Sequence, residues 1–159
     1  MRQINGILDY EKPDIEDLAL VALNDAATLS NALVDVTGLS IPLMNYSTYE
    51  FEAVLSCGTG NNANGCRYGV NFSAAGATIE AYILGAVTTA TTLTERIVAF
   101  NTATTAAFLT TALQDGGVLI KGIIVTGANK GNLTIQHLKV TALTSTVRIG
   151  SMLKTRKLE

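Results

Sequence analysis

The chain contains a single histidine, His137, and histidine is the usual general base near neutral pH. A catalytic triad built on it would also need a nucleophile and an acid close by in space. A zinc site built from it with Cys57 and Cys66 would lack a fourth ligand, and the spacing fits no standard zinc motif. Because Leu133 and Ile135 share the alternation of His137, we expect this histidine to pack within a strand.

Cys57 and Cys66 flank an eight-residue loop between two alternating segments, 49–57 and 66–72, which predict a β-hairpin. Both cysteines share the parity of aromatic neighbours, so they are expected to face each other across the strands. A disulfide between them would contribute about 2–3 kcal/mol by the chain-entropy estimate. The alternative is a pair of buried free thiols, which suits assembly under reducing conditions. Both interpretations stay open at this point.

Glu50 and Glu52 lie two residues apart on one face of a predicted strand, and Glu80 lies on another strand. A close pair of carboxylates is the arrangement that hydrolyses glycosides. We expect instead that these acids face outward from a sheet and are balanced by Arg67 and Arg96.

Two glycine-containing loops, 58–60 and 127–131, match neither the dinucleotide-binding nor the P-loop spacing and are expected to be turns. The residues therefore suggest no catalytic group, no cofactor and no metal ligand, and we expect a protein that is not an enzyme.

The elements that must position these residues are short strands separated by Gly- and Asn-containing turns. Strict alternation is clearest in 49–57, where Glu50 and Glu52 share one face and aromatic and aliphatic side chains the other. Such strands, spaced 8–14 residues apart, predict an all-β antiparallel sandwich. The predicted strands are Thr28–Leu43, Tyr49–Cys57, Cys66–Phe72, Thr78–Leu84, Thr92–Asn101, Val118–Thr126, Leu133–Ala142 and Val147–Lys154, with Thr105–Gln114 a strand or a short helix.

The N-terminal segment differs from the rest. Residues 1–26 carry six acids and two bases, and we expect them to form an arm ahead of a β-sandwich domain at 27–159. Residues 17–23 within it are apolar and fit a short helix or a strand. Large apolar residues spaced among the acids suit an extended segment that buries them in a capsid protein or a neighbouring subunit. These expected anchors are Ile4, Ile7, Leu8, Tyr10 and Ile15.

Composition limits the class of protein. The 159 residues suit one domain, and they are 48% hydrophobic but only 15% charged, against about 25% charged in an average soluble domain. This shortfall suggests that other subunits cover part of the surface. The net charge of −2 argues against a nucleic-acid partner, and no apolar run reaches the ~20 residues of a membrane span.

Charge is also distributed unevenly along the chain. Residues 1–60 have a net charge of −7, residues 61–120 of −1, and residues 121–159 of +6. One interpretation is that an acidic arm meets a basic C-terminal edge within or between subunits. The other is that both are solvated, because exposed ion pairs contribute only ~0–1 kcal/mol each.

Several segments, in order, resemble a β domain that recurs in structural proteins of tailed-bacteriophage particles. The resemblance covers about residues 28–158. The opening and the closing segments are its most specific parts. The matching segments are Val36-Thr-Gly-Leu-Ser-Ile-Pro-Leu43, Tyr49-Glu-Phe-Glu-Ala-Val-Leu55, Gly69-Val-Asn-Phe72, Thr78-Ile-Glu-Ala-Tyr-Ile83, the glycine-bounded Gly117–Gly127, Leu133-Thr-Ile-Gln136, and Val147-Arg-Ile-Gly-Ser-Met-Leu153 followed by Arg156.

The resemblance implies a jelly-roll-like sandwich, usually trimeric, on the surface of a phage capsid and made in the cytoplasm of the host bacterium. The expected partners are further copies of the chain and the major capsid protein or another virion protein. The short arm favours a capsid decoration or head-fibre protein. One alternative is a tail-fibre or baseplate tip that binds a host-surface glycan through residues 61–64 and Tyr68. A carbohydrate-active β-sandwich enzyme is another, and the scarcity of His and aromatic residues argues against it.

Overall fold

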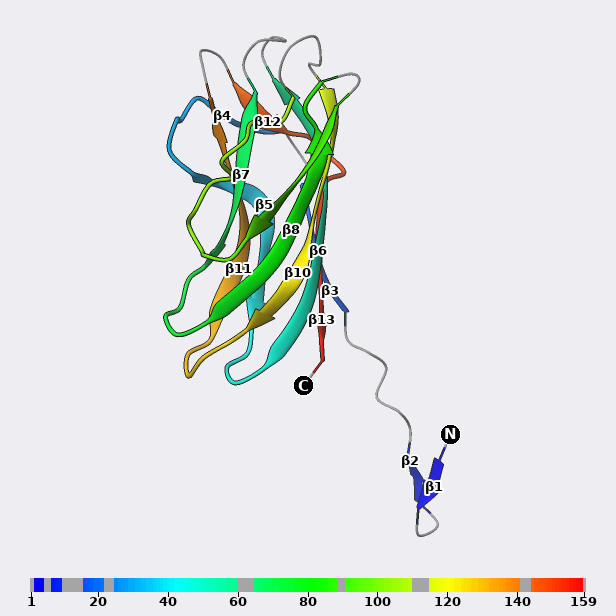
Figure 1. Ribbon diagram of the computed structural model, residues 1–159. Helices are drawn as coiled ribbons and strands as arrows, with labels where there is room; N and C mark the ends of the chain where they lie inside the picture. The colour runs from blue at the N-terminus through cyan, green and yellow to red at the C-terminus, as the bar shows by residue number, and fades with distance from the viewer. Residues whose placement is uncertain are drawn as a thin grey trace.

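A computed structural model describes residues 2–4, 7–9, 16–21, 25–59, 65–88, 91–109, 115–140 and 144–158. These residues form antiparallel β-strands and contain no helix (Figure 1). Two sheets pack face to face around one hydrophobic core. The all-β antiparallel sandwich predicted from the spacing of short alternating segments is therefore confirmed.

The larger sheet has eight strands, six of which follow one another side by side. Their spatial order is β3 (Glu16–Leu20), β13 (Met152–Lys157), β6 (Thr48–Thr59), β10 (Asp115–Val125), β8 (Thr78–Ala86) and β9 (Thr92–Ile97). The other two are β12 (Ser145–Val147), which pairs with β6, and β4 (Ala26–Thr28), which pairs with β12.

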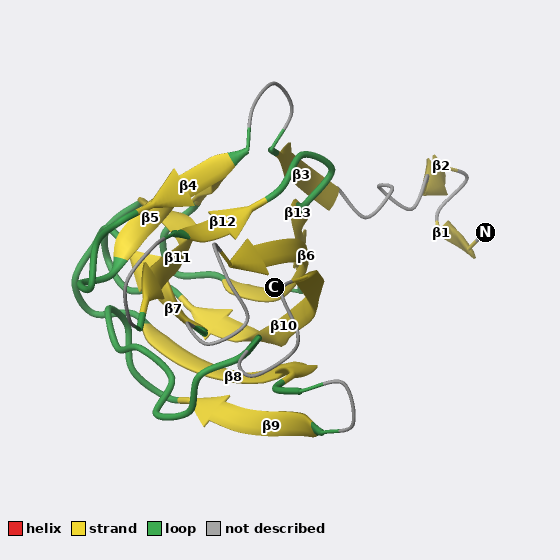
Figure 2. Ribbon diagram, turned by 90° about the horizontal axis from the view of Figure 1, so that it is seen from above, coloured by secondary structure: helices red, strands yellow, loops and turns green. Residues whose placement is uncertain are grey.

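The smaller sheet has three strands, in the order β5 (Val34–Leu43), β11 (Gly131–Lys139) and β7 (Cys66–Phe72). Viewed from above, the large sheet curves around this smaller one (Figure 2). The sheets pack because both strand sets alternate apolar and polar side chains, so each sheet has an inner apolar face. Fully buried side chains on the inner faces include Phe51 and Ile120 from the large sheet and Tyr68, Leu133 and Ile135 from the small one.

The predicted hairpin between 49–57 and 66–72 is wrong. The neighbours of β6 are β10 and β13 over most of its length and β12 at its end, whereas β7 pairs with β11 in the other sheet. The chain therefore crosses from one sheet to the other between Thr59 and Gly65. Both hydrogen-bonding edges of β6 are occupied by strands distant in sequence, which leaves no edge for β7.

Two of the expected strands are interrupted. The segment 28–43 contains only the last residue of β4, followed by β5 from Val34, and between the two strands Ser30 forms local bonds. Its N–H donates to Thr28 Oγ1 and its hydroxyl to the carbonyl of Ala32. Such side-chain bonds compete with a sheet ladder. The segment 147–154 contains the end of β12 and the start of β13, separated by a turn in which Gly150 has φ +86°, a conformation that favours glycine.

Strand β5 contains an irregularity near Gly38. The register of β5 against β11 shifts between Asp35 and Ser40, and Gly38 has φ +93°. A Cβ at this position would lie 2.6 Å from the carbonyl oxygen of Leu20. Glycine thus allows β5 to approach the end of β3 closely.

Part of the expected arm belongs to the sandwich. Residues 16–20 form β3, an edge strand that pairs with β13, and β4 begins at Ala26. The expected helix or strand at 17–23 is thus a strand in its described part. Before it, β1 (Arg2–Ile4) and β2 (Ile7–Asp9) pair only with each other and lie apart from the sandwich in Figure 1. They form a hairpin rather than a wholly extended segment.

Candidate interaction face

The large sheet has one face against the core and one face against solvent. The outer face of the large sheet is the solvent side of β3, β13, β6, β10, β8 and β9. Because side chains directly opposite each other on neighbouring strands share a face, the strand register defines rows across it. One row runs through Leu18, Lys154, Glu52, Lys121, Tyr82 and Arg96.

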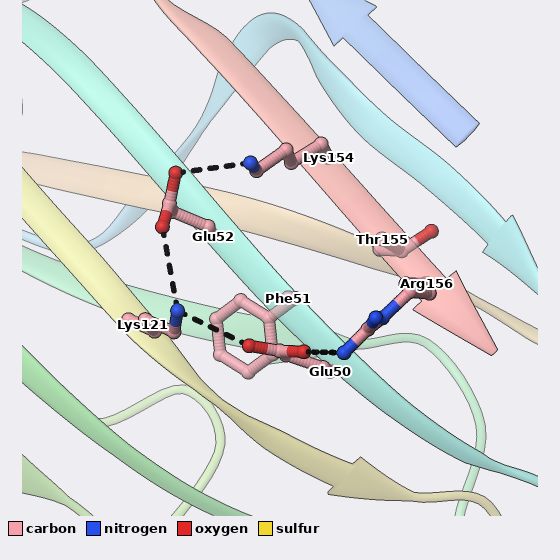
Figure 3. Close-up of a pocket in the computed structure, with 7 residues that line it drawn as sticks. All are labelled: Glu50, Phe51, Glu52, Lys121, Lys154, Thr155 and Arg156. Atoms are coloured by element: carbon pink, nitrogen blue, oxygen red, sulfur yellow. Dashed lines mark hydrogen bonds and ion pairs between the residues drawn. The ribbon is translucent and has the colours of Figure 1, made fainter. Parts of the chain in front are cut away.

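Charged side chains of opposite sign alternate at the centre of this face (Figure 3). Glu52 lies between two lysines, with its Oε1 3.3 Å from Lys154 Nζ and its Oε2 3.7 Å from Lys121 Nζ. Lys121 Nζ also lies 3.1 Å from Glu50 Oε1, and Arg156 donates a hydrogen bond of 2.7 Å to Glu50 Oε2. The two acids of β6 thus join β13 to β10 through a continuous chain of ion pairs.

This network changes the acidity of its members. The hydrogen bond from Lys121, followed by that from Arg156, lowers the pKa of Glu50 below its ordinary value. The hydrogen bond to Glu50 in turn raises the pKa of Lys121. Both shifts move the pKa further from neutral pH, whereas a general acid or a general base works best with a pKa near the operating pH. The arrangement suits binding and orientation better than proton transfer.

Exposed apolar side chains surround the charges. Eight of the thirteen large hydrophobic residues that are exposed in the described structure lie on the outer face of the large sheet. They are Leu18, Leu20, Val54, Tyr82, Leu84, Ile123, Val125 and Leu158. A groove on this face is lined by Tyr82, Ile123, Val125 and Leu158 together with Lys121 and Arg156.

The outer face of the small sheet is different. It is polar, with a hydroxyl pair between Ser40 and Thr134 at 2.9 Å and a bond of 2.8 Å from Gln136 Nε2 to Asp35 Oδ1. None of the exposed large hydrophobic residues of the described structure lies in β5, β7 or β11. The sandwich therefore has one polar side and one side with apolar residues and paired charges.

The outward orientation predicted for Glu50, Glu52 and Glu80 is correct, and one expected partner is confirmed, because Arg96 pairs with Glu80 at 2.9 Å. The other is wrong, because Arg67 lies on β7 in the other sheet and Glu50 and Glu52 have different partners. The partners that sequence reasoning missed are Lys121, Lys154 and Arg156. A signal for two of them was present, because the spacing Lys154-x-Arg156 matches Glu50-x-Glu52 on antiparallel strands.

The expected contact between an acidic arm and the basic C-terminal edge has a partial counterpart. Backbone pairing joins β3 of the N-terminal segment to the basic strand β13. The ion pairs that the structure gives for Lys154 and Arg156 run to β6.

The two cysteines are buried free thiols, one on each sheet. Burial raises the pKa of the Cys57 thiol to about 12 and also raises that of Cys66. The hydroxyl of Tyr68 is buried beside them, and its pKa is raised chiefly by the same loss of solvent. This region is part of the core, and the thiols are protonated at neutral pH.

His137 faces the core from β11, as its alternation predicts. It is 1% exposed, and its Nδ1 lies 3.1 Å from the hydroxyl of Ser145. Burial lowers its pKa to about 4, so the ring is neutral near pH 7. A neutral ring closed off from solvent packs against its neighbours and does not meet a substrate.

Other expected site residues have mixed outcomes. Tyr68, the aromatic residue suggested for glycan binding, is fully buried, and its proposed companions at 61–64 lie outside the described residues. Of the expected arm anchors, Tyr10 and Ile15 also lie outside the described residues, and for the others only the backbone is described. These three are Ile4 in β1 and Ile7 and Leu8 in β2.

In the described part of the chain, no three His, Cys, Asp or Glu side chains are grouped so that they could hold a metal ion. That part also has no helix long and apolar enough to cross a membrane.

Comparisons with known proteins identify no family for this chain. No protein-family model matches the chain. No curated protein matches it at a significant level. Two solved structures titled as infectious bursal disease virus, of the Gt and Gx strains, match with TM-scores of 0.24 and 0.22 and 10% sequence identity. Each match covers 91% of this chain and 39% of the viral chain, so this chain spans about two fifths of theirs. At such TM-scores the matches determine neither the fold nor the function.

Proposed function

We propose that the chain is a non-enzymatic structural protein of a tailed-phage particle, a trimeric capsid decoration or head-fibre protein. It acts through binding free energy rather than chemistry. The observation that carries this proposal is the outer face of the large sheet, where exposed apolar residues surround ion pairs that already satisfy one another. Large exposed apolar patches on a small domain mark interaction sites.

The sequence supports the same function. The segments around Val36–Leu43 and Gly150–Leu153 resemble those of β domains in phage structural proteins. In the structure the first is the strand β5 and the second begins β13, so both belong to the sandwich. The conspicuous titratable groups are unsuited to catalysis, because His137 is buried away from solvent and the pKa of Glu50 is shifted further from neutral pH.

The N-terminal segment supplies the attachment to the particle. Its strands β1 and β2 pair with each other and with no other described strand, while β3 is fixed to the sandwich through β13. A hairpin tethered in this way is free to bind a separate surface. Its apolar residues, among them Ile4 and Ile7, each contribute on the order of 1–3 kcal/mol if well buried in the partner.

Rebinding to particles tests this function. Phage particles that lack the protein are mixed with the purified chain or with a variant that lacks residues 1–15, and sedimented. Because the deletion ends before β3 begins at Glu16, the variant should keep the β-type circular dichroism spectrum and the number of chains per oligomer of the full chain. We expect the full chain to cosediment and the variant to bind at least tenfold more weakly.

Two results would count against the proposal. Failure of the full chain to bind any part of the particle would refute the virion function. Equal binding by the truncated variant would move the attachment site to the sandwich. Antibody labelling in the electron microscope then distinguishes the head, as proposed, from the tail, which would favour the receptor-binding alternative.

A further inference from the structure

The apolar residues of the outer face form two groups on either side of the charges. The register places Leu20, Met152, Val54, Leu119 and Leu84 opposite one another in a row across five strands. Of this row, Leu20, Val54 and Leu84 are each at least 40% exposed. Ile123, Val125 and Leu158 form the second group near the opposite end of the strands. A partner that covers both groups must also cover the charged row between them.

The charges limit the kind of partner. Glu50, Glu52 and Glu80 are paired with Lys121, Lys154, Arg156 and Arg96, which leaves a net charge of only about +1 from these seven groups. Nucleic acid and anionic lipid surfaces are bound by strongly basic patches, which this face lacks. An equally neutral surface with both signs interspersed is the complementary partner, and the face itself is such a surface.

The size of the face matches a specific interface. Six strands about 4.8 Å apart span roughly 24 Å, and the outward residues of β6 from Thr48 to Ser56 span about 27 Å at 3.4 Å per residue. The flat area of the face is therefore about 650 Å² per chain. Around a threefold axis each chain divides this area between two neighbours, so the three faces together cover about 2,000 Å², a total in the range of specific interfaces.

We infer that the outer face of the large sheet is where copies of this chain meet, three faces turned toward a common threefold axis. This inference rests on the proposed function for the number of copies and specifies the surface they use. In a threefold ring each chain meets its two neighbours through two different patches, and in this arrangement both patches lie on the outer face of the large sheet. None of the exposed large hydrophobic residues of the described structure lies on β5, β7 or β11, the strands of the small sheet.

Charge introduced into the apolar row tests the inference. Val54→Glu and Leu84→Glu are prepared as separate variants, because both side chains already contact solvent and each single change should leave the fold intact. Leu29→Glu is the matched control, since Leu29 is more exposed and lies outside the face. Light scattering after size-exclusion chromatography then gives the mass over a range of protein concentrations.

We expect three chains for the wild type and for Leu29→Glu, and dissociation to one chain for both face variants, with association weakened at least a hundredfold. Circular dichroism should show the same β spectrum for all four proteins. A trimer that persists in both face variants would overturn the inference, and so would a wild type that is a monomer. A face variant that does not fold is replaced by Lys121→Glu, which reverses a charge exposed at the centre of the face.

Two further measurements separate this inference from the proposed function. The chain without residues 1–15 should remain a trimer, and its dissociation would show that the arm, rather than the face, holds the copies together. Binding to particles is measured on the same proteins. A chain that binds particles but keeps its trimer in the face variants would retain the proposed function and refute only the face.

Discussion

Lowering the pH from 7.5 to 5 should destabilise the folded sandwich by about 2 kcal/mol through His137 alone. Its ordinary pKa of 6.5 applies to the unfolded chain, and burial lowers the pKa to about 4 in the folded one. Between these values the unfolded state binds more protons, so stability is complete above pH 6.5 and falls as the pH falls. The difference between the two pKa values lowers the free energy of unfolding by about 2 kcal/mol at pH 5 and by about 3 kcal/mol below pH 4.

Protonation of the carboxylates affects the stability of the fold only at lower pH. The pKa of Glu50 is lowered by Lys121 and Arg156, so its contribution is present above its ordinary value of 4.5 and is lost only as the pH falls below that value. The range from pH 7.5 to 5 therefore isolates the histidine. The variant His137→Gln keeps a polar side chain of similar size beside Ser145 and cannot be protonated there.

The assay is urea unfolding at several pH values and one protein concentration, because association itself stabilises the folded chain. We expect the wild type to lose about 2 kcal/mol between pH 7.5 and 5 and His137→Gln to lose almost none. The reasoning would be refuted by a wild type whose stability is flat over this range. It would also fail if the variant kept the same slope, because another group would then be responsible.

Two further predictions concern the core. Gly85→Ala should destabilise the fold by about 1–3 kcal/mol, because the new Cβ would lie 2.7 Å from a ring carbon of the buried Phe108. At Gly117 the nearest contact of a new Cβ is at 3.9 Å, so Gly117→Ala should change stability by less than about 0.5 kcal/mol. Urea unfolding measures both changes. Cys57 and Cys66 should resist alkylation by iodoacetamide at pH 8 in the folded protein and react fully in denaturant, since both thiols are buried and protonated. Rapid labelling of the folded protein would contradict this, and denatured, unreduced protein without free thiols would show a disulfide instead.

The fold could be predicted from the sequence where information is local. Alternation in 49–57 identified both the buried face of β6 and the outward direction of Glu50 and Glu52. Pairing between distant strands is not local. The residues between Cys57 and Cys66 do not indicate whether the chain stays in one sheet. In the structure β10, β12 and β13 occupy both edges of β6.

The residues of the outer face were likewise predictable where the signal is local and unpredictable where it depends on strand pairing. Its acids were found, but the assignment of partners requires the register of β6 against β10 and β13. That register brings Lys121 and Lys154 to either side of Glu52, although these residues are 69 and 102 positions away in sequence. The turn that separates β12 from β13 was also missed, because Gly150 by itself does not distinguish a turn from a bulge.

The most direct test of the proposed function is the amount of this chain in phage particles released from cells that carry its gene. Particles are purified by density gradient and washed in high salt, and peptides of the chain and of the major capsid protein are counted by quantitative mass spectrometry. The account predicts a fixed number of copies per particle, in multiples of three, retained through the wash. Particles that lack the chain, while the cells that released them contain it, would contradict the account.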